Sequence, residues 1–387
     1  MQITCDKELL LGGLNLVGRA VSTRSTKPIL ECVLLTARAG EGVTLCGNDL
    51  EMSIATVVIP AEVAAAGSVA LDAKLFTDIV RKMSGDFVTI ETDEKNLTLC
   101  KSARAKLKIA GQPGDEFPVV EEMNKVSARF RLRAVTLRDM IRQTIFSVSL
   151  DQSKLILTGE LFEIKDGELR VVSLDMFHIS YRMAALESAV LHEERKSVSA
   201  VIPAKALSEL SRVLPSEDEQ FVDFYFTDKR VVFETESFTF ISRLLEGEFI
   251  KYEQVFNEDF STLLVVDRAQ MLGALERAVL VATTENRKIP ITLDIKDDEL
   301  TITAQTERGQ FHEELPCQTD GKDLIICFNP QYLINVLRAL EAQHAVIKFA
   351  GQKSPCIIRG QRDSPDPEVT PPDDHKYLIL PLRPPVQ

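Results

Sequence analysis

The sequence repeats one pattern three times at a domain-sized interval. The segments are "VALDAKLFTDIVRKM" at 69–83, "AVIPAKALSELSRVL" at 200–214 and "ICFNPQYLINVLRAL" at 326–340. Each begins with alternating apolar residues, passes a polar residue or proline, and continues with apolar residues at helical spacing. The interval is about 130 residues, which indicates repeated domains rather than a solenoid of short repeats.

Other elements recur in the same order around these helices. A pair of alternating, strand-like segments with a polar turn follows each helix, at 87–101, 221–237 and 345–360. Each repeat also opens with a helical pattern, at 6–22, about 135–148 and about 266–281, followed by further strands such as 160–174 and 291–306. The pattern predicts an α+β fold in which two helices per repeat pack on largely antiparallel sheets. Linkers near 121–128 and 253–262 suggest domains at 1–121, 127–252 and 260–387.

Composition and motifs narrow the class of protein. No uninterrupted apolar run approaches the ~18 residues of a membrane span, and the charged N-terminus does not resemble a signal peptide, so we expect a cytoplasmic chain. The seven cysteines are scattered without a CxxC motif, which favours buried reduced thiols over a metal site. The sequence has no phosphate-binding glycine motif and no HExxH, and its five histidines are far apart. We therefore expect no catalytic site, no cofactor and no metal.

The distribution of charge is more informative than its sum. A formal net charge of −13 argues against a nucleic-acid partner. However, basic residues share helix faces, as Arg138 and Arg142 do at an i, i+4 spacing. Two further pairs are seven residues, or two helical turns, apart and therefore also share a face: Lys74 with Arg81, and Lys205 with Arg212. The corresponding helix of the third repeat carries Arg338. Acidic clusters lie elsewhere in the sequence, at 192–195, 216–220 and 257–260. These cations are either an ordinary solvated surface or a face that contacts DNA phosphates.

Four segments carry a resemblance to a known family. They are "STRSTKPIL" at 22–30, "SARAKLKIAGQPGDEFP" at 102–118, "FNPQYLINVLRAL" at 328–340 and "YLILPLR" at 377–383. Through them the whole chain resembles the β subunit of bacterial DNA polymerase III, the sliding clamp family. The resemblance implies a head-to-tail homodimeric ring whose helices line the hole and whose sheets form the rim. Such a ring slides on duplex DNA through phosphate contacts that carry no sequence information.

The same resemblance assigns roles to particular residues. It implies that Arg24, Lys74 and Lys154 approach DNA. It implies that Leu107 and Ile109 of one chain face Leu280 and Val281 of a second copy across the ring junction. The partners implied are double-stranded DNA, a second copy, the polymerase III catalytic subunit, a clamp loader, and other replication or repair proteins that carry short peptide motifs.

Those peptides would bind in an apolar groove. The matching residues are Leu157, Leu174, Asp175, Met176, Phe177, His178, Ile179, Ile250, Val255, Leu378, Leu380 and Leu382. We expect Met176, Phe177 and His178 at its rim. The family usually reads close to "TDGHRL" where this chain reads "LDMFHI" at 174–179, so Met176 replaces a glycine and His178 an arginine. We expect the position of the groove to persist and its peptide preference to differ.

Two other interpretations remain open at the level of sequence. A diverged copy of the clamp could close poorly and serve as a peptide-binding scaffold. An enzyme could use the triplicated scaffold, although no catalytic constellation is present. Native mass separates these possibilities, because a closed ring is a dimer.

Overall fold

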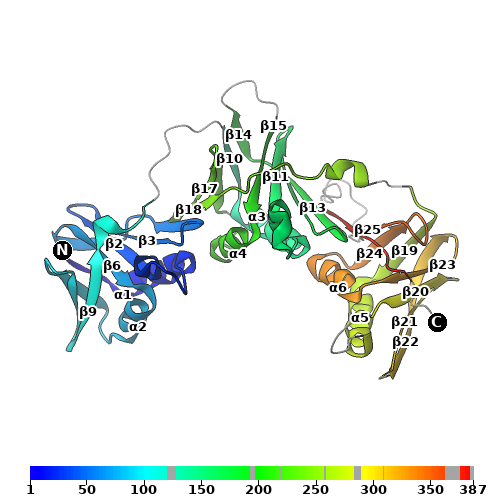
Figure 1. Cartoon of the computed structure of the whole chain (residues 1–387), viewed down its shortest axis with the longest axis horizontal. Helices are drawn as coiled ribbons and strands as arrows, with labels where there is room; N and C mark the ends of the chain where they lie inside the picture. Colours follow the sequence, from blue (N-terminus) through cyan, green and yellow to red (C-terminus); the bar gives the residue numbers. More distant parts are fainter. Residues whose placement is uncertain are drawn as a thin grey trace. The chain divides into compact units, whose positions relative to one another are not determined.

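The computed structural model describes residues 1–119, 128–191, 197–217, 219–256, 259–282, 289–307, 309–361 and 375–383. Most of the linker expected near 121–128 and the acidic cluster at 192–195 lie outside these residues. The chain forms two compact units. Unit 1 comprises residues 1–137, 186–195 and 205–244, and unit 2 comprises residues 138–185, 196–204 and 245–387. Each unit combines a terminal repeat with part of the middle one (Figure 1).

The described residues contain two α-helices in each repeat, as the periodicity predicts. They are α1 (Lys7–Val17), α2 (Ala73–Lys82), α3 (Ala134–Thr144), α4 (Ala204–Val213), α5 (Arg268–Ala282) and α6 (Pro330–Ala339). The polar residue before a helix often caps it, because its side chain accepts a free backbone N–H of the first turn. Asp6, Asp72 and Asn329 cap α1, α2 and α6 in this way. The first helix is shorter than expected, since the chain tightens into a 3₁₀ turn after Val17.

Unit 1 contains a single antiparallel sheet of 14 strands. Its order is β14-β10-β16-β17-β18-β4-β3-β2-β6-β9-β8-β7-β1-β5. The strands are β1 (Gln2–Asp6), β2 (Cys32–Arg38), β3 (Gly42–Asn48), β4 (Met52–Thr56), β5 (Ala61–Ala65), β6 (Gly67–Asp72), β7 (Phe87–Thr92), β8 (Leu97–Ser102), β9 (Ala105–Pro113), β10 (Ala128–Arg133), β14 (Ser188–Leu191), β16 (Phe221–Phe226), β17 (Arg230–Glu234) and β18 (Phe238–Arg243).

Unit 2 contains a 12-stranded antiparallel sheet. Its order is β15-β11-β12-β13-β26-β25-β24-β19-β22-β21-β20-β23. The strands are β11 (Gly159–Lys165), β12 (Glu168–Leu174), β13 (His178–Ala185), β15 (Ser197–Pro203), β19 (Thr262–Asp267), β20 (Ile291–Lys296), β21 (Glu299–Thr306), β22 (Gly309–Gly321), β23 (Leu324–Phe328), β24 (His344–Phe349), β25 (Cys356–Gln361) and β26 (His375–Ile379).

Strand pairing joins neighbouring repeats into one sheet inside each unit. In unit 1, β4 of the first repeat pairs with β18 of the second, from Met52↔Ser242 to Thr56↔Phe238. In unit 2, β13 of the second repeat pairs with β26 of the third, from His178↔Ile379 to Arg182↔His375. The two junctions are therefore made by the same kind of antiparallel pairing.

The helices cover the sheets through their apolar faces. Figure 1 shows α1 beside α2, and α5 beside α6, and both pairs are in contact. Gly13 permits the close approach of α1 to its sheet, because a Cβ there would lie 2.8 Å from side-chain atoms of Leu45 and Ile59. The side chains of β10 alternate between the core and solvent: Phe130 and Leu132 are buried, whereas Arg129 and Arg131 are exposed.

The remaining sequence expectations concern thiols and membrane spans. All seven cysteines are free, and five of them are buried while Cys46 and Cys317 are half-buried. Burial raises the pKa of the Cys5 thiol to about 12, with a smaller contribution from the charge of Asp6, so this thiol is inert at neutral pH. No helix among the described residues is long and apolar enough to cross a membrane.

Candidate functional site

The centre of the expected groove is the turn between β12 and β13. Asp175 Oδ1 accepts hydrogen bonds from the backbone N–H groups of Phe177 at 2.9 Å and His178 at 3.0 Å. A short aspartate side chain that binds the backbone two and three residues on is a common way to fix a turn. Met176 then takes a positive φ of 84°. A glycine adopts this conformation freely, whereas a residue with a Cβ is strained in it.

An aromatic stack holds the turn against α6. The rings of His178 and Tyr332 stack with centroids 4.3 Å apart, and Phe177 stacks on the same tyrosine at 6.5 Å. His178 Nδ1 lies 2.6 Å from Asp175 Oδ1. Burial opposes ionisation of Asp175, but hydrogen bonds from His178 and from the two backbone N–H groups outweigh it and lower the pKa of that carboxyl. The turn is thus anchored by a charged carboxylate.

The position of His178 corrects one expectation. We expected this side chain at the rim of the groove, but it is 3% exposed. The stack with Tyr332 covers one face of the ring, and its Nε2 has no hydrogen-bond partner among the described residues. Sequence reasoning missed Tyr332, which lies in the first turn of α6. The only sequence signal for it is an aromatic residue just after a helix-capping Asn-Pro.

The other groove residues form a graded apolar surface in unit 2. Leu174, Ile179 and Leu378 occupy one cross-strand row of β12, β13 and β26 and therefore share a face. Of the expected set, Leu157, Leu174 and Leu378 are buried, Ile179 and Leu382 are half-buried, and Met176, Phe177, Ile250, Val255 and Leu380 are exposed. The backbone N–H of Leu380 donates to the carbonyl of Phe177 at 2.8 Å, which fixes the C-terminal segment beside the turn. The exposed residues supply the accessible apolar surface, and the buried leucines belong to the core of unit 2.

The cationic helix residues are exposed, but several are paired with carboxylates. Arg81 contacts Asp78 at 2.6 Å, and Arg212 contacts Glu209 one turn earlier on its own helix. Lys205 lies 2.7 Å from Asp49 and 3.4 Å from Glu51, and Arg338 lies 2.7 Å from Glu276. Acidic clusters lie elsewhere in the sequence, but single carboxylates such as Asp78, Glu209 and Glu276 also interleave with the basic residues on the helices. Arg138 is half-buried and contacts Asp139 at 3.2 Å.

Four other expected DNA-contacting residues make no ion pair with a described residue. They are Arg24, Lys74, Arg142 and Lys154. Each is exposed, and within the described parts of the chain none has a carboxylate at ion-pair distance. Lys74 and Arg81 line a hollow beside α1 and α2 in unit 1. These free cations are the groups best able to bind phosphates.

Each unit leaves one long strand partly unpaired. Residues 105–110 of β9 pair with β8, and β6 takes up only 111–113. Residues 309–316 of β22 pair with β21, and β19 takes up only 317–321. Among the described residues, no strand occupies the second side of either segment. Such open edges invite pairing with another chain.

The expected junction residues lie on or near these segments. Leu107 on β9 is 42% exposed and Leu280 near the end of α5 is 81% exposed, whereas Val281 is half-buried. Ile109 is only 7% exposed, so its side chain packs within unit 1 and offers little surface to a second chain. Leu107 and Leu280 are therefore the stronger candidates for a junction.

Comparison with known proteins gives a consistent result over nearly the whole chain. Models of the DNA polymerase III beta subunit match its N-terminal domain to residues 1–121, its central domain to 131–251 and its C-terminal domain to 253–382. A beta sliding clamp of Staphylococcus epidermidis is 31% identical over 393 residues, covering 99% of each chain. The sliding clamp structure from Bacillus subtilis is 30% identical with a TM-score of 0.91 and 99% coverage of both chains. A DnaN sliding clamp from Pseudomonas aeruginosa, solved with griselimycin bound, is 28% identical with a TM-score of 0.89 and the same coverage.

The chain belongs to the DNA polymerase III beta subunit family, and its fold is the three-domain clamp fold.

Proposed function

We propose that the protein is a replication processivity clamp: two copies close head to tail into a ring that encircles duplex DNA, slides along it, and tethers the polymerase III catalytic subunit and other factors. The family match over nearly the whole chain supports this role. The role is that of an accessory subunit, and we assign no reaction to the chain itself.

The pattern of junctions carries the proposal of a ring. The first and second repeats join through β4 and β18, and the second and third join through β13 and β26. In each junction, the strand that follows a hairpin of one repeat (β2–β3 or β11–β12) pairs with the last strand of the next repeat. The same rule leaves β22 of the third repeat and β9 of the first without such a partner. In a dimer, β22 of each copy can pair with β9 of the other copy. Head-to-tail contacts of this kind form a closed ring when the rotation between copies completes a full circle.

Charge on the two open strands supports this pairing. The β9 edge carries Lys106 and Lys108, both exposed, and β22 carries Glu313 and Glu314. Glu313 is already paired with Arg277 of α5, whose Nη2 lies 2.5 Å from its Oε1. Glu314 contacts only His312 among the described residues. Opposite charges on facing strands favour the correct partner and register.

A clamp must hold DNA without immobilising it. Free cations such as Lys74 and Arg142 attract phosphates, whereas carboxylates beside Arg81 and Arg212 weaken the attraction locally. Contacts of this kind carry no sequence information. The protein remains acidic overall, at −13, which disfavours binding to DNA from outside the ring.

The groove of unit 2 is the proposed docking site for partner peptides. Its exposed apolar side chains, among them Met176, Phe177 and Leu380, can contact apolar anchors, and the buried leucines support the strands that carry them. An extended peptide with a few leucine or aromatic side chains suits such a surface. Because His178 is buried, it gives a peptide no equivalent of the arginine fork usual in the family.

The test of the clamp function is retention on DNA of defined topology. The protein is loaded onto a nicked circular plasmid with a clamp loader, and gel filtration measures what stays bound before and after the plasmid is cut. We expect retention on the circle and release from the linear form, because only a ring is held topologically. Equal retention on both forms would contradict the proposal.

Charge-reversed variants test the DNA-facing surface. We expect Lys74→Glu with Arg142→Glu to reduce retention at every DNA sequence. The salt slope should become shallower by roughly 0.9 for each phosphate that the variant no longer neutralises. The matched control reverses Arg38 and Lys296, which are exposed and lie at strand ends. Retention equal in both double variants would show that the helix cations do not contact DNA.

A peptide titration tests the groove. A fluorescent glutamine- and leucine-rich clamp-binding peptide is titrated against the parent and Leu380→Asp. We expect the variant to bind at least tenfold more weakly, because a charge would lie at the edge of the apolar surface. Equal binding by both would place the partner site elsewhere.

A further inference from the structure

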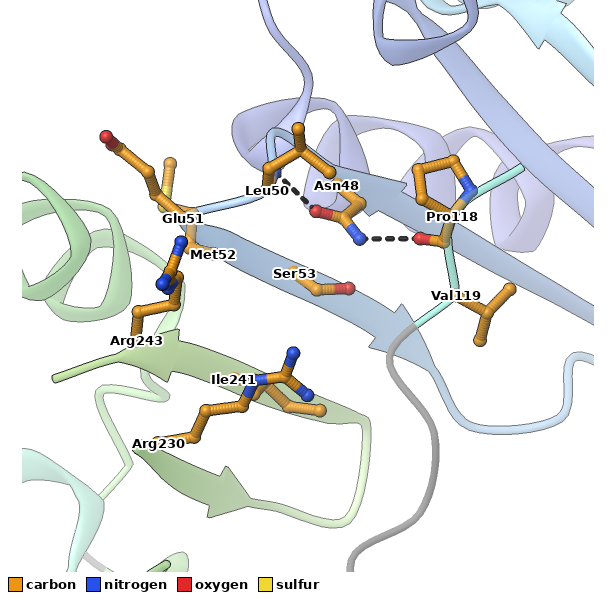
Figure 2. A pocket seen from close by; sticks show the side chains of 10 residues that line it. All are labelled: Asn48, Leu50, Glu51, Met52, Ser53, Pro118, Val119, Arg230, Ile241 and Arg243. Carbon is orange, nitrogen blue, oxygen red and sulfur yellow. Dashed lines mark hydrogen bonds between the residues drawn. The ribbon is translucent and has the colours of Figure 1, made fainter. Parts of the chain in front are cut away.

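Unit 1 contains a small surface cavity that the clamp function does not use. Its volume is about 110 Å³, and it lies between the β3–β4 turn, the segment that follows β9, and strands β17 and β18. Figure 2 shows Asn48 and Ser53 beside Pro118 and Val119, with Arg230 and Arg243 on the neighbouring strands β17 and β18 of the same sheet. We refer to this cavity as the Asn48 pocket.

Hydrogen bonds fix the walls of the Asn48 pocket before any ligand binds. Asn48 is 3% exposed, and its Nδ2 donates to the carbonyl of Pro118 at 2.6 Å (Figure 2). Its Oδ1 accepts the backbone N–H of Leu50, also at 2.6 Å. The hydroxyl of Ser53 donates to the carbonyl of Gly47 at 3.0 Å. One buried amide therefore ties the β3–β4 turn to the segment that closes the pocket.

Two arginines on the neighbouring strands β17 and β18 are arranged unfavourably for stability alone. Arg230 and Arg243 are direct cross-strand partners of β17 and β18, so their side chains share a face. Like charges in this position repel each other. No carboxylate of the described residues lies at ion-pair distance from either guanidinium. In the same sheet, by contrast, Arg131 makes two hydrogen bonds to Asp223, at 2.8 and 2.9 Å.

The turn beside these arginines has the same construction as the turn of the groove in unit 2. Asp49 Oδ1 accepts the backbone N–H groups of Glu51 at 3.0 Å and Met52 at 2.8 Å, as Asp175 does for its own turn. Leu50 has a φ of 75°, which corresponds to 84° at Met176. Five other described non-glycine residues also have a positive φ, so the likeness of the two turns rests on the aspartate and the positive φ together. The two repeat junctions thus share an aspartate-fixed turn with a positive φ, and they differ in the side chains around that turn.

We propose that the Asn48 pocket is a second peptide site, which takes one aliphatic side chain from a short acidic segment of a partner protein, with Arg230 and Arg243 binding the flanking carboxylates. Two unpaired guanidinium groups on one face can bind carboxylates through forked hydrogen bonds and so relieve their mutual repulsion. The cavity is somewhat smaller than the ~150 Å³ space that encloses a benzene molecule, which suits a leucine or valine side chain. Leu50 and Val119 are exposed at its mouth and would cover the peptide. This site does not depend on ring closure or on the groove.

The test uses the full chain and a labelled peptide, Gly-Asp-Leu-Glu-Gly, followed by fluorescence anisotropy. Two control peptides are Gly-Asn-Leu-Gln-Gly, which lacks the charges, and Gly-Asp-Ala-Glu-Gly, which lacks the anchor. The protein variants are Arg230→Gln with Arg243→Gln, the matched exposed-arginine control Arg38→Gln, and the groove variant Leu380→Asp. Thermal unfolding of each variant establishes that it is folded.

We expect saturable binding of the acidic peptide that weakens roughly tenfold when both pocket arginines become glutamine, because each exposed ion pair is worth up to about fivefold. Both control peptides should bind more weakly, and Arg38→Gln and Leu380→Asp should bind as the parent does. Three results would each overturn the proposal: no saturable binding by the parent, an unchanged affinity in the double arginine variant, or equal competition by free acetate, which would indicate a small-anion site. Loss of binding in Leu380→Asp alone would assign the peptide to the groove instead.

Discussion

Replacing Leu280 with aspartate tests ring closure most directly. Leu280 is 81% exposed near the end of α5, so its side chain contributes little to the folding of its own unit. A surface substitution of this kind changes the stability of the protomer by no more than about 0.5 kcal/mol. Any large effect must therefore come from a contact with a second chain.

The expected effect on the dimer follows from the exposed area. Complete burial of a leucine side chain is worth about 1.5–3 kcal/mol, and four-fifths of that is roughly 2 kcal/mol for each junction. A ring of two copies has two equivalent junctions, so the apolar loss alone is about 4 kcal/mol, close to a thousandfold in the dissociation constant. Burial of an unpaired aspartate would add several kcal/mol more, even after relaxation.

Sedimentation velocity over a dilution series measures this effect. We expect the parent to remain a dimer at concentrations where Leu280→Asp is a monomer with an unchanged thermal transition. The matched control is Leu150→Asp, because Leu150 is 91% exposed in the same unit and belongs to neither α5 nor β22. Dimers of equal stability in Leu280→Asp and the parent would refute the placement of α5 at the junction. Dissociation of both variants would refute its specificity.

Two further predictions concern the interior and the turn of unit 2. Met176→Gly should raise the free energy of unfolding by about 0.5–1 kcal/mol, because glycine accepts the positive φ of 84°. Met176→Ala should give no such gain, because alanine keeps the Cβ that causes the strain. Thermal unfolding of the two variants measures the difference. Burial raises the pKa of Glu160 from 4.5 to about 8, although Thr144 donates a hydrogen bond to it at 2.6 Å. Below about pH 4.5 the carboxyl is protonated in both the folded and the unfolded state, and its contribution to stability is complete. Between about pH 4.5 and 8 only the unfolded chain releases the proton, so the stability of the fold decreases as pH rises. Above about pH 8 the lost stability is constant. Glu160→Gln should remove this dependence, and the variant should exceed the parent most in the thermal midpoint at alkaline pH; parallel midpoint curves would contradict the prediction.

Much of the fold is predictable because local patterns specify it. The alternation at 160–174 and 291–306 resolves into β11 with β12 and β20 with β21, each joined by a tight acidic turn. The helix positions follow equally well, since apolar residues recur at helical spacing and a capping residue such as Asp72 precedes several of the helices. Periods of two and 3.6 residues identify such elements without any knowledge of tertiary contacts.

The features that could not be predicted depend on contacts between distant residues. His178 carries the alternation of an ordinary strand, and only the packing of α6 makes it a buried ring stacked on Tyr332. The ion pairs of Lys205 join residues more than 150 positions apart in the sequence. The opposition of Arg230 and Arg243 requires the register of β17 and β18 to be known. In each case the residue type was visible and its partner was not.

The repeated junction explains how one chain acquires different surfaces from a single backbone plan. At both internal junctions an aspartate fixes the turn, and the next residue takes a strained positive φ. Both positions with this strained backbone carry a large apolar side chain, Leu50 in unit 1 and Met176 in unit 2, and neither is a glycine. In unit 2 the neighbouring strands add leucines, and an apolar groove results; in unit 1 they add arginines, and a cationic pocket results. If the strain served folding alone, glycine would be the better residue at both positions. Glycine at either position should leave the fold intact. Leu50→Gly should weaken peptide binding at the first junction, whereas Met176→Gly restores the residue usual in the family and should change which peptides the groove of unit 2 binds, rather than abolish binding.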